Sequence, residues 1–107
     1  MKKIMFFLLA VFPVTCIADQ LLEVRTVKRV FAEGDSIAGF YTNEGLDFCK
    51  WGIMYIDLNN ADGTPKESRL AQLSMVLAAK SAQWKIVRMD YILTGESSCR
   101  LTALHIE

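Results

Sequence analysis

Apolar and polar residues alternate along much of the chain beyond residue 20, and this period of two is typical of half-buried β-strands. Leu22, Val24 and Thr26 keep the period, but Val27 also has the character of a buried residue. This break predicts one long strand with a bulge or a strong coil. The expected strands are residues 21–32, 36–42, 51–58, 85–91 and 100–106. Both faces of the third are apolar, so we expect it to be central or to have its outer face covered. Gly39, in the second, is expected at a bulge or a close approach.

A second pattern, with apolar residues three and four positions apart, predicts one helix between the third and fourth strands. Thr64 is expected as the N-cap, Pro65 as the first helical residue and Glu67 as the capping-box partner. The helix is expected to end near Ser81, after about 16 residues or four and a half turns. Its apolar stripe, expected to face the core, consists of Leu70, Leu73, Val76 and Leu77.

The resulting order of elements is β-β-β-α-β-β, which is the order of the five-stranded oligonucleotide/oligosaccharide-binding (OB) barrel. We therefore predict a mainly β fold, an OB-like five-stranded barrel with one helix that plugs an end of the barrel. The long first strand suits the coiled first strand of such a barrel. An open β-sheet with one packed helix is the alternative architecture.

Residues 1–18 have the pattern of a bacterial signal peptide. Two lysines precede an apolar run at 4–12, and small residues stand at −3 and −1 before Asp19. The apolar run is shorter than the roughly 20 residues that a membrane-spanning helix needs. We therefore expect residues 19–107 to form a single periplasmic or secreted domain, with no membrane span after the signal is removed.

Two other interpretations of the N-terminus stay open. The apolar run could be a buried helix, or Cys16 could be the anchored cysteine of a lipoprotein. Lipoprotein sites usually carry Leu three positions before the cysteine and a small residue directly before it. Pro13 and Thr15 occupy those two positions here, which favours the signal peptide.

Removal of the signal would also remove Cys16 and leave two cysteines, Cys49 and Cys99. An even count in an oxidising compartment predicts a disulfide between them. A metal site would need further ligands, and the one histidine is His105. A redox site usually contains a C-x-x-C motif, which is absent from the sequence. We therefore expect no metal at this pair.

Charge and catalytic residue types then narrow the function. The chain has 107 residues, with 12 basic and 12 acidic ones, and two of the basic ones lie in the signal, so the rest has a net charge of 10 − 12 = −2. This balance argues against a nucleic-acid partner, which would demand excess cations. His105 has no marked nucleophile beside it, and Asp57, Asp62 and Asp90 stand at strand ends and in loops where solvated carboxylates are ordinary. We expect neither an enzyme nor a cofactor.

Aromatic residues with polar neighbours are the better candidates for a binding site, because such a ring can stack on a sugar or on a partner side chain. Tyr41 and Asn43 lead the second strand into its loop, and Trp84 follows the helix between Gln83 and Lys85. We expect a shallow polar–aromatic site near Tyr41, Asn43 or Trp84. Trp51 is equally balanced between site and core, and a core position is expected for Phe40, Phe48 and Tyr55.

The last third of the chain resembles a known pattern. A helix containing Leu-Ala-Ala-Lys-Ser-Ala precedes Lys-Ile-Val-Arg-Met-Asp-Tyr, followed by Cys99 and a closing strand that ends Leu-His-Ile-Glu at residue 107. This is similar to the B subunits of subtilase-type bacterial toxins and to other small exported bacterial proteins. It covers about 35 residues, whereas the first half matches only in strand order and in the cysteine before the third strand. The resemblance implies an OB barrel, a pentamer with helices near its axis, and glycan binding, but no sugar-contacting residue carries over by motif.

Together these features predict an exported, B-subunit-like binding module for a glycan or protein partner. Met75, Val76 and Ala79 widen the apolar surface of the helix, which predicts a homo-oligomer. The alternative is a monomeric periplasmic accessory protein that binds a protein or a small ligand.

Overall fold

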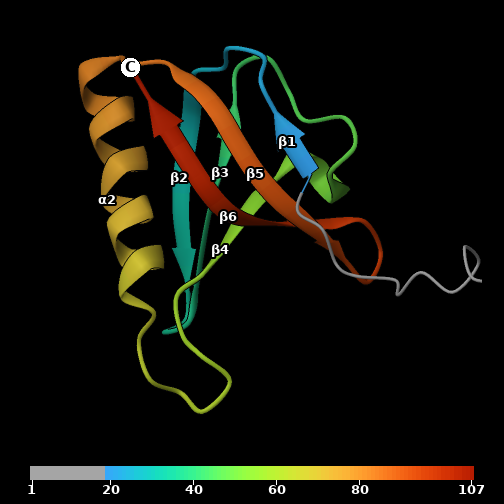
Figure 1. Ribbon diagram of the computed structural model, residues 1–107, viewed down its shortest axis with the longest axis vertical. Helices are drawn as coiled ribbons and strands as arrows, with labels where there is room; N and C mark the ends of the chain where they lie inside the picture. The colour runs from blue at the N-terminus through green and yellow to red at the C-terminus, as the bar shows by residue number, and fades with distance from the viewer. Residues whose placement is uncertain (1–18) are drawn as a thin grey trace, which may run out of the picture.

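Within residues 19–107, strands from the two ends of this stretch meet in one sheet, and one α-helix packs against it (Figure 1). The computed structural model describes residues 19–107, so the expected signal peptide and Cys16 lie outside the described residues. The strands are β1 (Asp19–Leu21), β2 (Val27–Glu33), β3 (Ile37–Thr42), β4 (Met54–Asp57), β5 (Ile86–Thr94) and β6 (Ser98–Ile106). The helix is α2 (Glu67–Ala82), and a short 3₁₀ turn, η2 (Lys50–Gly52), precedes β4.

The strand order within the described chain is β1-β5-β6-β4-β3-β2. Neighbours are antiparallel except for β4 and β6, which are parallel. The fold is therefore mainly β, as predicted, and the expected third strand, now β4, is central. The sheet has two edges, β1 and β2, and is not closed into a barrel. One isolated bridge between Arg25 and Ile86 joins the segment before β2 to the start of β5.

The long first strand that the sequence predicts is divided in two. β1 pairs with β5, whereas β2 pairs with β3, so the chain has to change partners between Leu21 and Val27. A strand cannot lie beside both partners without bending. The predicted irregularity is confirmed inside β2, where the register shifts between Val27 and Arg29.

The third strand begins later than predicted. Trp51 and Gly52 have φ values of 60° and 69°, which are left-handed and cannot continue a strand. These residues form the turn η2 instead, and β4 starts at Met54.

The capping box expected at Thr64 and Glu67 is wrong. The carboxylate of Asp62 accepts hydrogen bonds from both the backbone N–H and the hydroxyl of Thr64, at 2.9 and 2.6 Å. Thr64 is thereby held in a local turn. Pro65 is bridged to Asn59 in extended conformation, and the helix begins at Glu67 with Lys66 as its N-cap.

The helix also faces the core differently from the expected stripe. Val76 and Ala79 are buried and Leu73 packs against the core, but Leu70 and Leu77 are 41% and 48% exposed. On this helix the face toward β6 also carries Arg69 and Gln72, whose side chains donate to the carbonyl of Thr102 at 3.4 and 3.1 Å. These two side chains lie with Val76 and Ala79 on the side of the helix that meets the sheet, and Leu70 and Leu77 lie on the exposed side.

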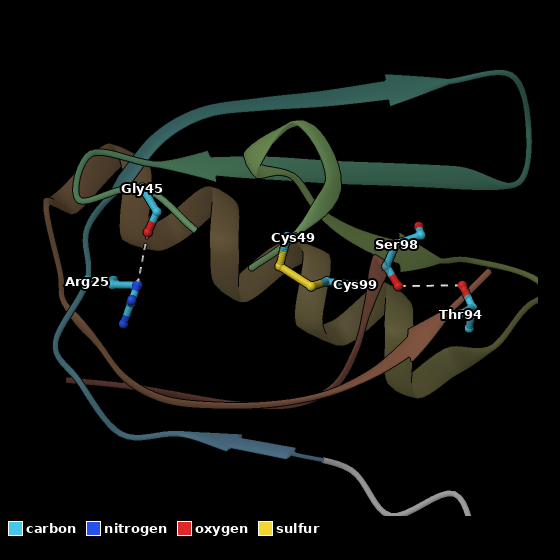
Figure 2. Close-up of a disulfide and its surroundings, with 6 residues drawn as sticks. All are labelled: Arg25, Gly45, Cys49, Thr94, Ser98 and Cys99. Atoms are coloured by element: carbon cyan, nitrogen blue, oxygen red, sulfur yellow. Dashed lines mark hydrogen bonds between the residues drawn. A yellow bond between two sulfur atoms is a disulfide. The ribbon is translucent and has the colours of Figure 1, made fainter. Parts of the chain in front are cut away.

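The predicted disulfide is confirmed between Cys49 and Cys99, whose Cα atoms are 5.4 Å apart (Figure 2). It ties Cys49, the residue before η2, to Cys99, the second residue of β6. The β5–β6 hairpin is longer than predicted, since the strands continue to Thr94 and start again at Ser98. Its turn is closed by Gly95 and Ser97, which both have positive φ.

Candidate functional site

The residues expected to form a binding site lie where the edge strand β2 meets the C-terminal half of α2. Asn43 and Trp84 line one hollow of about 360 Å³ together with Thr26, Lys80 and Gln83. We call this the polar hollow. Asn43 directly follows β3, and Trp84 lies two residues beyond α2. Two of the three expected residues, which are 41 positions apart in sequence (84 − 43), are therefore brought together.

The backbone at the end of the helix presents Trp84. Gln83 takes the left-handed conformation, with φ of 60° and ψ of 35°, and its N–H donates to the carbonyl of Ala79. The N–H of Trp84 donates to the same carbonyl at 3.0 Å. This is a capped helix end, although the residue in the position that glycine usually occupies is Gln83. The indole of Trp84 is left 47% exposed beside the amide of Gln83.

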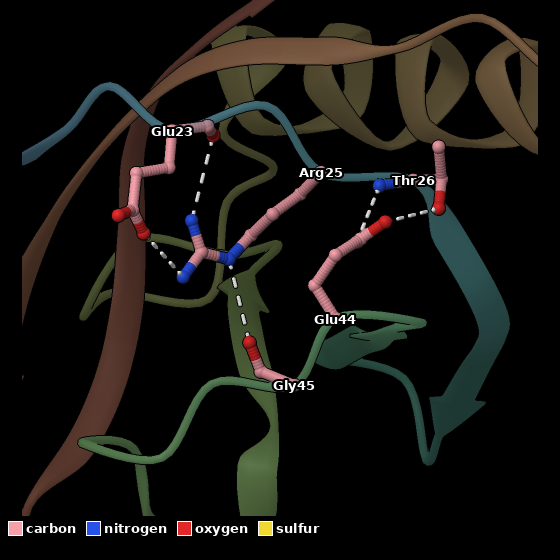
Figure 3. A network of polar contacts seen from close by, with 5 residues as sticks. All are labelled: Glu23, Arg25, Thr26, Glu44 and Gly45. Carbon is pink, nitrogen blue, oxygen red and sulfur yellow. Dashed lines mark hydrogen bonds and ion pairs between the residues drawn. The ribbon is translucent and has the colours of Figure 1, made fainter.

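A polar network holds the opposite wall of the hollow (Figure 3). Glu44 accepts hydrogen bonds from the N–H and the hydroxyl of Thr26, at 2.7 and 2.8 Å. The amide of Asn43 donates to the same hydroxyl at 2.9 Å. Desolvation raises the pKa of Glu44, but the hydrogen bonds from Thr26 outweigh it and hold the pKa below its ordinary value. Asn43 is thus held by the hydroxyl of Thr26, which is itself held by the Glu44 carboxylate.

A second set of polar contacts, which the sequence does not predict, is made by Arg25, the residue before Thr26. The guanidinium of Arg25 is largely buried and donates to the carbonyl of Gly45 at 3.3 Å. It also contacts the carboxylate of Glu23 at 3.3 Å. The backbone of Arg25 exchanges hydrogen bonds of 2.9 and 2.8 Å with Ile86 on β5. Arg25 therefore joins the loop after β3 to the start of β5. An arginine at a polar position of a predicted strand gives no local signal of this role.

Tyr41, the third expected residue, lines an adjoining hollow of about 460 Å³ that shares Lys80 with the first. We call this the basic hollow. Lys28, Arg29 and Lys80 line it, and among its described lining residues there is no carboxylate. The guanidinium of Arg29 lies 4.4 Å from the centre of the Tyr41 ring. The local potential is therefore positive and would attract a negatively charged group.

Other aromatic rings gather on the face of the sheet away from the helix. Phe31 lies between Tyr41 and Tyr55, with ring centres 5.9 and 6.0 Å away. The guanidinium of Arg100 lies 4.9 Å from the Tyr55 ring and is paired with Asp57 at 2.7 Å. The core position expected for Tyr55 is thus wrong.

Of the two other aromatic residues expected in the core, one is buried and the other is exposed. Phe40 is confirmed in the core with no exposed surface, whereas Phe48 is 37% exposed. Phe48 stacks on Tyr91 with their ring centres 5.1 Å apart. The core is thus closed on that side by Tyr91, which is itself buried, and Phe48 covers it from outside.

Of the residues considered for chemistry, His105 and Asp90 lie near each other on the paired strands β6 and β5, whereas Asp57 and Asp62 lie elsewhere. His105 is exposed on β6. Asp57 pairs with Arg100, Asp62 caps its own turn, and Asp90 pairs with Arg88 at 2.9 Å. Within residues 19–107 no group of three or more histidine, cysteine or carboxylate side chains is placed to hold a metal.

In the same stretch, no helix combines the length and the apolar character needed to cross a membrane. Comparison of the chain with models of known protein families, with curated proteins and with solved structures gives no match. The residues of the polar and basic hollows are therefore the basis for assigning a function.

Proposed function

We propose that this chain is an exported saccharide-binding module whose ligand occupies the polar hollow. The observation that carries the proposal is the exposed indole of Trp84 beside the amides of Asn43 and Gln83 in one hollow. An indole offers an apolar face to the C–H groups of a sugar ring. The side-chain amides can both donate to and accept from its hydroxyl groups.

The rigidity of the wall supports binding. Asn43 is held by Thr26, and Thr26 is held by Glu44. The Asn43 amide is therefore already ordered before a ligand binds. Preorganised polar groups reduce the entropic cost of binding. Lys80, shared by both hollows, allows a ligand to extend from the polar hollow toward Tyr41.

An OB-like architecture is the finer description of the fold that we propose. It is supported by the continuous run β2-β3-β4-β6-β5, which contains five strands. The bridge between Arg25 and Ile86 brings the two ends of this run together through one pair of hydrogen bonds. A five-stranded barrel that is only partly closed has this character, and β1 then adds a short outer strand to β5.

Assembly into a homo-oligomer is the second part of the proposal. It is supported by the outward face of α2, where Leu70 and Leu77 are exposed. Ala71 and Ser74 are exposed as well, so this face is apolar or small between them. Such a surface on a small domain usually marks an interface.

Export is supported by the Cys49–Cys99 disulfide, which is typical of an oxidising compartment.

The site is tested by comparing the exported protein with its Trp84→Ala variant on a glycan array. We expect the variant to lose about tenfold or more in affinity for every glycan bound at this site. Trp84→Phe, which keeps a ring, should lose less. Leu22→Ala removes an exposed apolar side chain that does not line the hollow and serves as the matched control. Unchanged binding by a folded Trp84→Ala variant would remove the polar hollow as the site.

A further inference from the structure

Trp51 lies outside both hollows described above and has an unusual position. It is 70% exposed, the highest value among the exposed large apolar side chains of residues 19–107. It occupies the middle of η2 and lines a separate hollow of about 530 Å³, the Trp51 hollow. The hollow is also lined by Glu33, Lys50, Tyr55, Glu96, Ser98 and Arg100.

The backbone holds the indole in a conformation that tryptophan rarely adopts. Trp51 has φ of 60° and ψ of 13°, which is the left-handed region. A residue with a bulky side chain is strained there, and such strain persists only where the surroundings enforce it. No burial compensates for it, because the ring is turned to solvent.

The surroundings that enforce this conformation are covalent and hydrogen-bonded. Cys49, two residues before Trp51, is bonded to Cys99 on β6. The N–H of Lys50 donates to the carbonyl of Ser97 at 2.9 Å, and the N–H of Gly52 donates to the carbonyl of Cys49 at 2.9 Å. The turn is therefore tied to the β5–β6 hairpin through Cys49 and Lys50, directly before the indole, and the hydrogen bond from Gly52 to Cys49 closes the turn around Trp51. Figure 2 shows the disulfide beside this hairpin.

The charged groups around the ring are balanced. The ammonium group of Lys50 lies 4.5 Å from the centre of the Trp51 ring and is paired with Glu96. Arg100 is paired with Asp57 beyond the hollow, and Glu33 adds a second carboxylate to the lining. Two cations and two carboxylates thus line this hollow, whereas the basic hollow has three cations. An ion of either sign gains little here.

We propose that the Trp51 hollow is a second ligand site, and that its ligand is a neutral saccharide. One sugar ring stacks on the indole face opposite Lys50. Its hydroxyl groups exchange hydrogen bonds with Glu96, Ser98 and Arg100, which line the same hollow as both acceptors and donors. Tyr55 forms the apolar floor beside Arg100. The site shares the saccharide class with the proposed function, but none of its residues.

The decisive comparison uses a glycan array that carries neutral and charged glycans, with the exported protein and its Trp51→Ala, Trp51→Phe and Trp84→Ala variants. We expect Trp51→Ala to lose about tenfold or more in affinity for a set of neutral glycans and to keep the glycans lost by Trp84→Ala. Trp51→Phe should retain most of the neutral set. Leu93→Ala, an exposed apolar residue that does not line the Trp51 hollow, is the matched control.

A solution measurement provides the second readout. The chain has two tryptophans, so Trp84→Phe leaves Trp51 as the single fluorescent indole. Titration of this variant with lactose, maltotriose and chitotriose at millimolar concentrations should give a saturable change in emission with at least one of them. Folding of every variant is checked by circular dichroism and by mass analysis of the Cys49–Cys99 disulfide.

The outcomes separate the two proposals. A Trp51→Ala variant that binds every neutral glycan as tightly as the parent does overturns the Trp51 site. So does a parent that binds no neutral glycan on the array and shows no saturable change in the titration. The polar hollow fails independently, if Trp84→Ala binds as the parent does.

Discussion

At the scale of single residues, Gly39 shows how one missing side chain organises a face of the sheet. The sequence is compatible with a bulge or a close approach at this position. The pairing of Gly39 with Phe31 on one side and Tyr55 on the other runs without a register shift at Gly39. A Cβ atom there would lie 2.6 Å from the ring of Phe31 and 3.0 Å from the carbonyl oxygen of Met54. Gly39 is therefore a close approach, and the ring of Phe31 covers it.

We predict that Gly39→Ala lowers the free energy of unfolding by about 1–3 kcal/mol, the usual cost of forcing extra atoms into a packed site. Denaturant unfolding measures this value. In a Phe31→Ala background the same substitution should cost clearly less, because the nearest clash is with the ring and only the Met54 carbonyl remains. Equal costs in both backgrounds would show that the ring does not limit the space.

Asp90 carries a prediction about pH. Its hydrogen bonds from Arg88, both 2.9 Å, hold the pKa of the carboxyl below the ordinary value of 3.8, with a smaller contribution from His105. As the pH falls, the Asp90 carboxyl is therefore protonated at a higher pH in the unfolded chain than in the folded protein. The stabilisation from this pair is therefore present at neutral pH and is lost as the pH falls from about 5 through the folded pKa.

Asp90→Asn should accordingly flatten the dependence of unfolding free energy on pH below about pH 5. Urea unfolding at a series of pH values gives the slope. Asp35→Asn, in the exposed turn between β2 and β3, removes the same charge without an ion pair and serves as the control. A slope as steep in Asp90→Asn as in the parent contradicts the assignment.

At the scale of elements, the two ends of α2 follow different rules. The start is decided by competition, since Asp62 captures the threonine that would have capped the helix. The end is decided by backbone conformation, since Gln83 adopts the left-handed geometry that favours glycine. The energetic cost of the left-handed conformation at Gln83 can be measured separately from the contribution of the Gln83 side chain.

Gln83→Gly is expected to raise the free energy of unfolding by roughly 0.5–1 kcal/mol, because relief of left-handed strain exceeds the entropy that glycine adds to the unfolded chain. Gln83→Ala keeps the strain and removes the amide, so it should not stabilise the protein. Thermal unfolding of both variants makes the comparison. The same two variants should both weaken saccharide binding, since each lacks the amide beside Trp84. If alanine stabilises as much as glycine, the backbone is not the cause.

At the scale of the whole molecule, the packing of α2 on the sheet decides which apolar side chains of the helix remain exposed. The sheet buries one side of α2 and leaves Leu70 and Leu77 in solvent. The expected stripe was drawn from spacing, and spacing alone does not state which side of a helix meets a sheet. The prediction that Met75, Val76 and Ala79 widen the exposed apolar surface is wrong, because Val76 and Ala79 are buried and Met75 packs against the core. The large apolar side chains that α2 exposes are Leu70 and Leu77.

We predict that light scattering will show a homo-oligomer of the protein, without residues 1–18, at tens of micromolar. Leu70→Glu, which places a charge on the outward face of α2, should shift the mass toward the monomer of about 10 kDa. Leu93→Glu introduces the same charge at an exposed position on β5 and should leave the mass unchanged. A monomeric parent removes the ring arrangement and favours the accessory-protein alternative.

Local chemistry was sufficient to determine most elements of this protein. Alternation of apolar residues located most of the strands, three- and four-residue spacing located the helix α2, and the count of cysteines predicted the Cys49–Cys99 bond. These signals are readable because they depend on neighbours within a few positions of the chain, or on a count. The proximity of Asn43 and Trp84 was not determined in this way, although each was chosen as a site residue.

Tertiary structure alone decided the features that depend on distant partners. It made β4 and β6 parallel neighbours, divided the first strand between β5 and β3, and left the sheet open. It also placed Val76 and Ala79, rather than Leu70, against the sheet, with α2 joined to Thr102 by hydrogen bonds. The physical reason is the same in each case. Hydrogen bonds and packing between residues 30 or more positions apart compete with local preference, and periodicity carries no record of which partner wins.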